Sequence, residues 1–310
     1  MPVYVLGHKS PDTDSVTSAV AFAALQKALG VDAVPCRQGD PNPETELAFK
    51  KFGVPMPELL TDVTGKQYML VDHSDIKQAP DNWDKGELLG VVDHHKIGDV
   101  TTASPIFFCA MPVGCTGTAL YHLYIDLYKK PIDPKVAGLM LSAILSDTVL
   151  FKSPTCTPDD KTAAEALAKI AGVSDLKAWG LELAKAKSSV DGVPPMDLIH
   201  RDYKDFNMSG KTVGIGQLEL VSLSQVNNDL KCAIMDNLKK MKVDGNRHSV
   251  FLMLTDTMEK EGTELLAVTD DPSVVEKAFG KKLEGNSVWL PGVMSRKKQM
   301  VPPLEKAFAA

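Results

Sequence analysis

Acidic and imidazole side chains follow several short apolar runs of the sequence, at the point where each run ends. Six of them are His8, Asp12, Asp14, Asp72, His94 and Asp147. Carboxylates mixed with imidazoles, without thiolates, suit a divalent ion of intermediate hardness such as Mn²⁺ better than structural zinc. Four Asp and two His can hold two ions about 3.5–4 Å apart, the spacing that clamps the attacking and leaving oxygens in phosphoryl transfer. The pattern therefore indicates a two-metal centre for phosphate chemistry.

A dense basic cluster stands near the end of a chain that is otherwise acidic. The segment Ser295–Gln299 reads S-R-K-K-Q, in a sequence whose formal net charge is −6. Two divalent ions cancel the charge of four carboxylates, so a polyanionic substrate needs further cations. Arg296 and Lys297 can supply them, because arginine binds phosphate bidentately and lysine acts as a point charge. The cluster predicts a phosphate-binding element.

The elements that must position these residues alternate between strand and helix patterns over the first 190 residues. Continuous apolar runs, typical of strands buried on both faces, occupy Val3–Leu6, Val31–Cys36, Tyr68–Val71 and Leu88–Val92. Helical patterns occupy Val16–Leu29, Thr116–Tyr128 and Val136–Leu145, and a further helix is expected to start at Thr157. This alternation predicts an α/β fold with a mostly parallel, doubly wound sheet, in which ligands bind at the carboxyl ends of the strands.

A segment rich in serine, glycine and proline, Ser188–Pro195, interrupts this alternation and is typical of a linker. We therefore expect a larger N-terminal domain over residues 1–189, a linker over 190–196 and a smaller α/β domain over 197–310. In the smaller domain we expect strands at Thr212–Leu220, Ser249–Thr255 and Leu265–Thr269, and helices at Leu223–Lys242 and Ser273–Phe279.

Composition narrows the class of protein. Of 310 residues, 44% are hydrophobic and 24% charged, which excludes a disordered or fibrous chain. The acidic balance gives no electrostatic case for binding nucleic acid or an anionic membrane, and the apolar stretches are shorter than the ~20 residues of a membrane span. Five dispersed cysteines without a C-x-x-C pair, and no signal-peptide pattern, predict a cytoplasmic location.

Five motifs run in order along the whole chain: H-x-x-x-D-x-D from His8, V-D-H from Val71, D-H-H from Asp93, S-D-T from Ser146 and S-R-K-K-Q from Ser295. Together they resemble the manganese-dependent (family II) inorganic pyrophosphatases of the DHH phosphoesterase superfamily. S-R-K-K-Q is the most specific of them, whereas D-H-H alone indicates only the superfamily. The resemblance implies hydrolysis of pyrophosphate to two orthophosphates at the interface between a DHH domain and a DHHA2-like domain that closes over it. It also implies a homodimer formed through the first domain.

The resemblance further implies a role for each motif residue. One Mn²⁺ is expected on His8, Asp12 and Asp72, and a second on Asp14, Asp72, His94 and Asp147. A water or hydroxide between the ions would be the nucleophile, with Asp14 beside it, and Asp93 would orient the metal-binding histidine. The residues expected to hold the phosphates and stabilise the leaving group are His95, Lys204, Arg296 and Lys297. Co²⁺ or Mg²⁺ is expected to substitute for Mn²⁺, and a further Mg²⁺ or Mn²⁺ to arrive with the substrate.

Each residue also has a structural interpretation. Asp12 and Asp14 suit the N-terminus of a helix, Asp147 suits a turn, and histidines after a strand can be satisfied by backbone carbonyls. Ser295–Gln299 alone fits a solvated basic patch, in which Lys298, if on a strand, faces away from its neighbours. We read residues 39–43 as a loop without chemistry and assign His73 and Asp75 no definite role.

Three other functions stay open from the residues. The first is a DHH-type short-chain exopolyphosphatase, whose substrate needs the same groups. The second is an oligonucleotide or 3′-phosphonucleotide phosphatase, although the G-G-G-H element of the nuclease-like branch does not occur in the sequence. The third is a non-catalytic phosphate or metal sensor that kept the fold.

Overall fold

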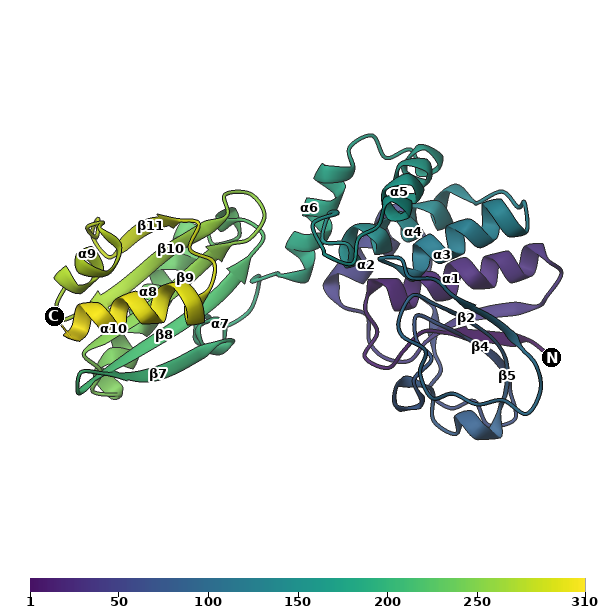
Figure 1. Cartoon of the computed structure of the whole chain (residues 1–310), viewed down its shortest axis with the longest axis horizontal. Coiled ribbons are helices and arrows are strands. Elements are labelled where there is room, and N and C mark those ends of the chain that lie inside the picture. Colours follow the sequence, from purple (N-terminus) through teal and green to yellow (C-terminus); the bar gives the residue numbers. More distant parts are fainter. Residues whose placement is uncertain (310) are drawn as a thin grey trace. The chain divides into compact units, whose positions relative to one another are not determined.

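The computed structural model describes residues 1–309. The chain divides into two compact units, one over Met1–Lys187 and a smaller one that begins at Ser188 (Figure 1). Each unit has its own β-sheet and its own hydrophobic core. Among the helices of the described residues, none is long and apolar enough to cross a membrane.

The first unit is built on a six-stranded parallel sheet of order β3-β2-β1-β4-β5-β6. Its strands are β1 (Val3–Leu6), β2 (Ala33–Arg37), β3 (Glu58–Leu59), β4 (Gln67–Val71), β5 (Glu87–Asp93) and β6 (Phe107–Ala110). The predicted α/β class with a parallel sheet is confirmed. The strand order reverses between β1 and β4, and ligands of open α/β sheets bind at such a switch point, beyond the carboxyl ends of the strands.

The helices of the first unit pack on one face of this sheet (Figure 1). They are α1 (Thr13–Ala28), α2 (Pro43–Phe52), α3 (Thr116–His122), α4 (Pro134–Asp147), α5 (Pro158–Ala171) and α6 (Leu176–Lys187), and a π-helical turn over Leu123–Leu127 continues α3. The other face is covered by loops and short 3₁₀ turns, from which Val63 and Val100 pack near Leu70. The chain segments that connect parallel strands across this second face therefore contain no α-helix.

Side-chain caps decide where these helices begin. The Asp12 carboxylate accepts a hydrogen bond from the Ser15 amide at 3.0 Å, so α1 starts at Thr13, earlier than the apolar pattern predicts. Thr157 and Asp160 form a capping box, which confirms the predicted helix start at Thr157. Asn42 caps α2, a helix that the sequence did not predict and that follows the expected loop directly.

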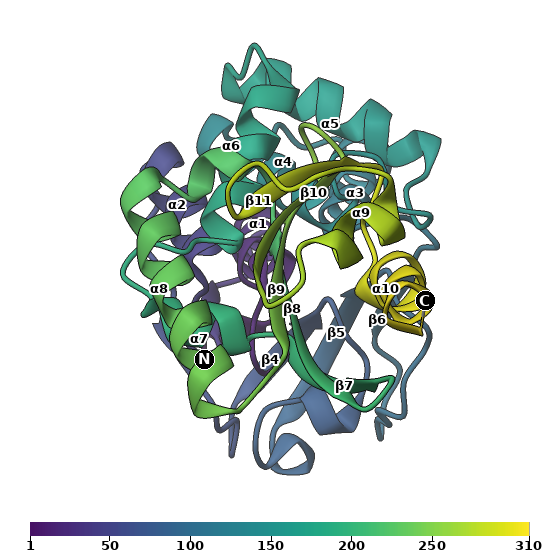
Figure 2. The same ribbon diagram turned by 90° about the vertical axis from the view of Figure 1, so that its left-hand side faces the viewer.

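The second unit is a five-stranded mixed sheet of order β11-β10-β9-β8-β7, covered by helices on both faces (Figure 2). Its strands are β7 (Tyr203–Met208), β8 (Lys211–Leu220), β9 (Ser249–Asp256), β10 (Gly262–Thr269) and β11 (Ser287–Pro291). Only β8 and β9 run parallel. Helices α7 (Pro195–His200) and α8 (Asn228–Asp244) cover one face, and α9 (Ser273–Phe279) and α10 (Val301–Ala309) the other.

Two sequence predictions in this unit are wrong in detail. The helix expected over Leu223–Lys242 begins only at Asn228, because Ser222 and Gln225 close a separate 3₁₀ turn with a capping box. The strand geometry assumed for Lys298 does not exist, because a π-helical turn over Arg296–Met300 follows β11. The expectation that Lys298 faces away from its neighbours, which assumed a strand, therefore does not apply.

Candidate metal centre

The switch point between β1 and β4 gathers the predicted metal ligands of the first unit. Three sets of side chains each have candidate ligand atoms within 4.8 Å of one another: His8, Asp12 and Asp72; Asp72, His94 and His95; and Asp14, Cys115 and Asp147. These side chains come from the loop after β1, the first turn of α1, the ends of β4 and β5, the N-cap of α3 and the last residue of α4. The fold thus brings all six predicted metal ligands into overlapping or adjacent groups.

Asp72 lies at the middle of this arrangement. It follows the last residue of β4 with a φ of 64°, in the left-handed region, where aspartate is better tolerated than bulky or β-branched residues. One carboxylate oxygen, Oδ2, lies 3.3 Å from His8 Nε2, and the other, Oδ1, lies 3.4 Å from His94 Nε2. The sharp turn after β4 therefore aims one buried carboxylate at two histidines from different strand ends.

Both histidines are oriented by backbone carbonyls. His8 Nδ1 lies 2.8 Å from the carbonyl oxygen of Lys9, and His94 Nδ1 lies 3.1 Å from that of Val113. A ring that donates from Nδ1 to a carbonyl leaves Nε2 available as the metal-binding atom. Each histidine can therefore bond a backbone carbonyl through Nδ1 and still bind a metal through Nε2. The structural and the functional interpretations are compatible.

Asp14, in the first turn of α1, is fully buried, and its carboxylate faces the N-terminus of α3. Its carboxylate accepts hydrogen bonds from the amides of Thr116 and Gly117, at 2.7 and 3.2 Å, and from the Ser18 hydroxyl at 2.6 Å. The Thr116 hydroxyl in turn donates to Asp72 Oδ1 at 3.0 Å. Thr116 was not among the predicted site residues, although free amides at a helix start next to clustered acids are the signal for such a position.

Cys115 was not predicted either, because the expected ligand set contained no thiolate. Its side chain caps α3 and lies beside Asp14 and Asp147. Burial, followed by the charges of Asp14 and Asp147, raises the pKa of Cys115 well above its ordinary value. This shift favours the neutral thiol, which is a poor metal ligand, so carboxylates and imidazoles remain the candidate donors.

Burial, and after it repulsion from neighbouring carboxylates, disfavours the charged form of two acids in this cluster. Burial and the neighbouring Asp72 raise the pKa of Asp14 to about 6, and burial with Asp14 raises the pKa of Asp147 well above its usual range. Burial would also raise the pKa of Asp72, but hydrogen bonds from His8 and His94 hold it below its usual range. The metal-free cluster thus carries more negative charge than its surroundings can balance.

Protons on the two histidines compensate for part of that charge. Burial disfavours the charged rings, yet Asp72 together with Asp12 raises the pKa of His8 to about 11. In the same way, Asp72 and Asp14 raise the pKa of His94 to about 9 against the effect of burial. A divalent ion can take the place of these protons, so the donor set fits ions such as Mn²⁺.

Asp93 differs from its predicted role. Its Oδ1 accepts hydrogen bonds from both the amide and Nδ1 of His95, each at 3.0 Å, and its Oδ2 accepts one from the Ser74 hydroxyl at 3.2 Å. Aspartate side chains commonly bond the amide two residues ahead, which selects His95 rather than His94. Asp93 therefore orients the histidine expected to bind phosphate, whereas the Val113 carbonyl orients the expected metal ligand.

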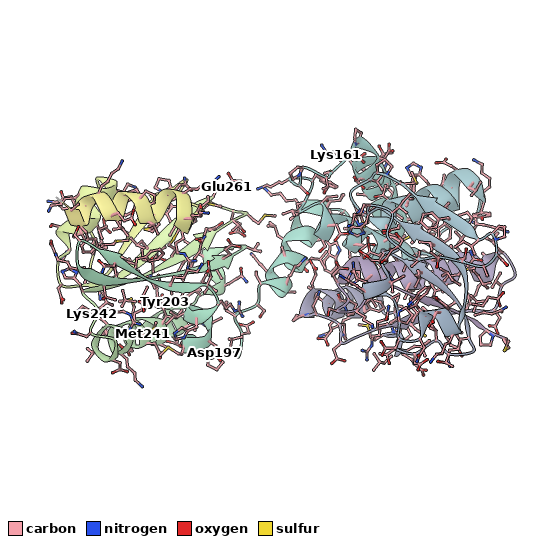
Figure 3. All side chains as sticks on the ribbon, turned by 60° about the horizontal axis from the view of Figure 1, so that its bottom comes forward. Lys161, Asp197, Tyr203, Met241, Lys242 and Glu261 are labelled. Carbon is pink, nitrogen blue, oxygen red and sulfur yellow. The ribbon has the colours of Figure 1, made fainter. Side chains whose placement is uncertain are left out.

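The remaining predicted residues belong to the second unit. Lys204 follows Tyr203, labelled in Figure 3, on β7, and it pairs with Ile215 across the sheet. Arg296, in the π-helical turn that also holds Lys297, donates from Nη1 to the Ile215 carbonyl at 3.2 Å and from Nη2 to Asp202 Oδ1 at 2.6 Å. The second sheet therefore brings Lys204 and Arg296 to neighbouring positions.

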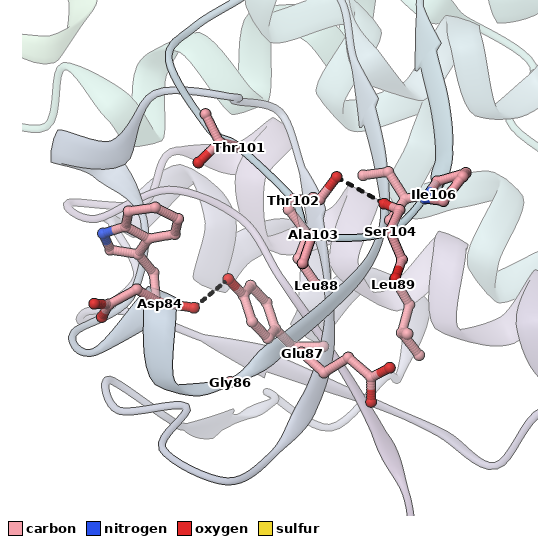
Figure 4. Close-up of a pocket in the computed structure, with 13 residues that line it drawn as sticks. Asp84, Gly86, Glu87, Leu88, Leu89, Thr101, Thr102, Ala103, Ser104 and Ile106 are labelled. Atoms are coloured by element: carbon pink, nitrogen blue, oxygen red, sulfur yellow. Dashed lines mark hydrogen bonds between the residues drawn. The ribbon is translucent and has the colours of Figure 1, made fainter.

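A pocket of about 580 Å³ in the first unit lies elsewhere (Figure 4). Its lining includes Tyr68 and Leu88, near the amino ends of β4 and β5, and it therefore opens at the sheet edge opposite Asp72. Asp84 and Glu87 add negative charge, and none of the described residues that line it is basic. With two acids and no cation among these lining residues, the pocket does not suit a polyanionic substrate.

Comparison with known proteins places both parts of the chain in described domain families. Residues 2–144 match the DHH family N-terminal domain, and residues 181–307 match the DHHA2 domain. A protein of Archaeoglobus fulgidus named probable manganese-dependent inorganic pyrophosphatase is 56% identical, over 99% of this chain and 98% of its own. One of Methanocaldococcus jannaschii named manganese-dependent inorganic pyrophosphatase is 49% identical, over 98% and 99%. A crystal structure named as that of a Methanococcus jannaschii putative family II inorganic pyrophosphatase matches over 100% of both chains at 48% identity, with a TM-score of 0.60.

Proposed function

The chain belongs to the manganese-dependent inorganic pyrophosphatases, a family of hydrolases, and we propose that it hydrolyses pyrophosphate to two orthophosphates at a di-manganese site. The observation that carries the proposal is the position of Asp72, whose two oxygens face His8 and His94 from opposite ends of one carboxylate. A carboxylate placed in this way suits a bridge between two cations.

In this proposal, one Mn²⁺ is held by His8, Asp12 and Asp72, and the other by Asp14, Asp72, His94 and Asp147. When bound, the two ions supply Lewis-acid stabilisation of the phosphates and acidify a water between them. Co²⁺ or Mg²⁺ can substitute, because the same oxygen and imidazole donors accept them, and a further Mg²⁺ or Mn²⁺ arrives with the substrate.

Protein side chains supply the remaining chemistry. Asp14 orients the attacking water and accepts its proton, a role supported by its fixed hydrogen bonds to Ser18 and to the start of α3. The hydrogen bond from His95 to Asp93 raises the pKa of His95, which favours the imidazolium and lets it donate a proton to the leaving phosphate. The cations proposed to bind the phosphate oxygens are Lys204, Arg296 and Lys297.

We also propose a homodimer that forms through the first unit. Strand β6 is at the edge of the parallel sheet, and its Phe108 side chain is 39% exposed. An open strand edge that carries apolar side chains favours pairing with another chain.

All five cysteines are unpaired, which supports the expected cytoplasmic location.

The first experiment measures orthophosphate release by metal-stripped protein reconstituted with Mn²⁺. Pyrophosphate, tripolyphosphate and a 3′-phosphorylated adenosine nucleotide are the three substrates. We expect Mn²⁺-dependent turnover of pyrophosphate, and loss of both bound metal and turnover in Asp72→Asn, in which the amide keeps the left-handed backbone accessible. Turnover only of tripolyphosphate or the nucleotide would reject the proposed substrate, and full activity of Asp72→Asn would reject the metal assignment.

A further inference from the structure

Glu44 is a buried acid that the proposed mechanism does not use. It lies in the first turn of α2, with only 1% of its surface exposed. Its Oε2 accepts a hydrogen bond from the Thr13 hydroxyl at 2.7 Å and another from the Ser146 hydroxyl at 2.8 Å. One carboxylate oxygen therefore connects two segments that are far apart in the sequence.

These two hydroxyls belong to the immediate neighbours of proposed metal ligands. Thr13 stands between Asp12 and Asp14 at the start of α1, and Ser146 directly precedes Asp147 at the end of α4. Candidate ligand atoms of Asp14 and Asp147 lie within 4.8 Å of each other. A hydrogen-bonded link between the residues next to them keeps the two carboxylates within reach of one ion.

The position of Glu44 is itself well determined. The first turn of a helix favours a negative charge, and Asn42 fixes the start of α2 by accepting a hydrogen bond from the Thr45 amide at 2.8 Å. The Lys187 ammonium, at the end of α6, lies 3.7 Å from Glu44 Oε2 and 3.4 Å from the Ser146 hydroxyl. A lysine from a third segment thus supplies a partly solvated counter-charge.

We propose that Glu44 is a positioning residue of the metal centre, which sets the spacing between the Asp12–Asp14 segment and Asp147 through the hydroxyls of Thr13 and Ser146. The inference rests on the proposed metal ligands and adds a residue that binds neither metal nor substrate. Groups that hold ligands in place raise metal affinity, because a preorganised site needs no rearrangement when the ion binds.

The test measures Mn²⁺ binding to metal-stripped protein by equilibrium dialysis, independently of turnover. Glu44→Ala should weaken Mn²⁺ binding about tenfold, the lower end of the range for residues that support metal ligands. Glu44→Gln should stay close to the unmodified protein, because the amide oxygen still accepts from both hydroxyls. Glu46→Ala, which removes an exposed acid from the same turn of α2, is the matched control and should bind Mn²⁺ normally.

Unchanged affinity in Glu44→Ala, or equal losses in Glu44→Ala and Glu44→Gln, would overturn the inference. If Glu44→Ala does not fold, Thr13→Val decides, since it removes one of the two hydroxyls and should weaken binding several-fold. Asp147→Asn separates this inference from the proposed function. Normal Mn²⁺ binding in Asp147→Asn would show that Asp147 is not a metal ligand. Weak Mn²⁺ binding in Asp147→Asn together with normal Mn²⁺ binding in Glu44→Ala would reject only the role of Glu44.

Discussion

The Thr116 hydroxyl donates a 3.0 Å hydrogen bond to Asp72 Oδ1, across a sequence separation of 44 residues. The amide of the same threonine donates to Asp14 Oδ2 at 2.7 Å. One residue at the start of α3 therefore holds two carboxylates that the proposed centre assigns to metal. Hydrogen bonds of this kind fix which lone pairs of a carboxylate face the ion.

Replacing Thr116 by valine should weaken Mn²⁺ binding about tenfold, because the hydroxyl contact to Asp72 is lost while shape and backbone amide remain. Thr116→Ser keeps the hydroxyl and should bind Mn²⁺ almost normally. Equilibrium dialysis of the two metal-stripped variants gives the comparison. Equal affinities for the valine and serine variants would show that the hydroxyl does not orient Asp72.

Affinity for Mn²⁺ should rise with pH between 7 and 9. In the metal-free protein, Asp72 and its neighbours outweigh burial and raise the pKa of His94 to about 9 and that of His8 to about 11. Each ring must lose its proton to bind metal through Nε2, so the dissociation constant should fall by up to about tenfold per pH unit for each proton released. Dialysis at pH 7, 8 and 9 measures this slope, and a flat profile would contradict it.

The same shift predicts the pH dependence of stability without metal. The folded protein binds the His94 proton more tightly than the unfolded chain does, since its pKa rises from 6.5 to about 9 on folding. The contribution of this proton to the free energy of unfolding is complete below pH 6.5 and is lost as the pH rises through 9. Urea unfolding of metal-stripped protein should therefore give a smaller free energy of unfolding at pH 9 than at pH 6.5, and His94→Gln should reduce the difference.

Arg296→Ala should impair use of pyrophosphate and leave the metal content intact. A hydrogen bond to a charged group contributes about 1.5–3 kcal/mol, so kcat/KM should fall about 10- to 100-fold. Arg296→Lys should not restore it, because lysine cannot reproduce the planar contacts with Asp202 and Ile215. Steady-state kinetics and metal analysis of the same samples provide the test, and loss of metal in Arg296→Ala would contradict a role in phosphate binding.

Asp160 should be important for the stability of the first unit. Its buried carboxylate accepts hydrogen bonds from the Gly114 amide at 2.9 Å, the Thr118 hydroxyl at 2.6 Å and both the amide and hydroxyl of Thr157 at 2.7 Å. Asp160→Ala leaves these donors without an acceptor and should lower the free energy of unfolding by about 3 kcal/mol. Urea unfolding gives the value, and Asp159→Ala, at an exposed position beside it, should change it little.

The sequence was sufficient to predict where the side chains proposed to bind metal gather. Continuous apolar runs mark strands buried on both faces, so the bounds of β1 were predicted correctly and those of β4 and β5 to within one residue. The carboxyl ends of neighbouring parallel strands meet at one edge of the sheet, which places Asp72 between His8 and His94. Local patterns and topology together therefore account for the shared location of these residues.

The supporting contacts could not be predicted in this way. Glu44 receives its hydrogen bonds from residues 31 and 102 positions away, and Thr116 contributes a backbone amide that any residue type except proline would offer. Asp93 accepts from the His95 amide in a local turn, and this contact replaces the expected contact with His94. Such contacts follow from the packing of α2, α3 and α4, which periodicity in the sequence does not describe.

The proposed ligands extend from His8 to Asp147, nearly half the chain, and no two of the four segments that carry them are adjacent in sequence. An unfolded chain therefore offers no preformed site, and an ion can bind only after β1, β4, β5 and α4 have assembled. By mass action, a ligand that binds only the folded state opposes unfolding more strongly as its free concentration rises. Manganese supply would then govern how long each molecule survives proteolysis, as well as how fast it turns over substrate.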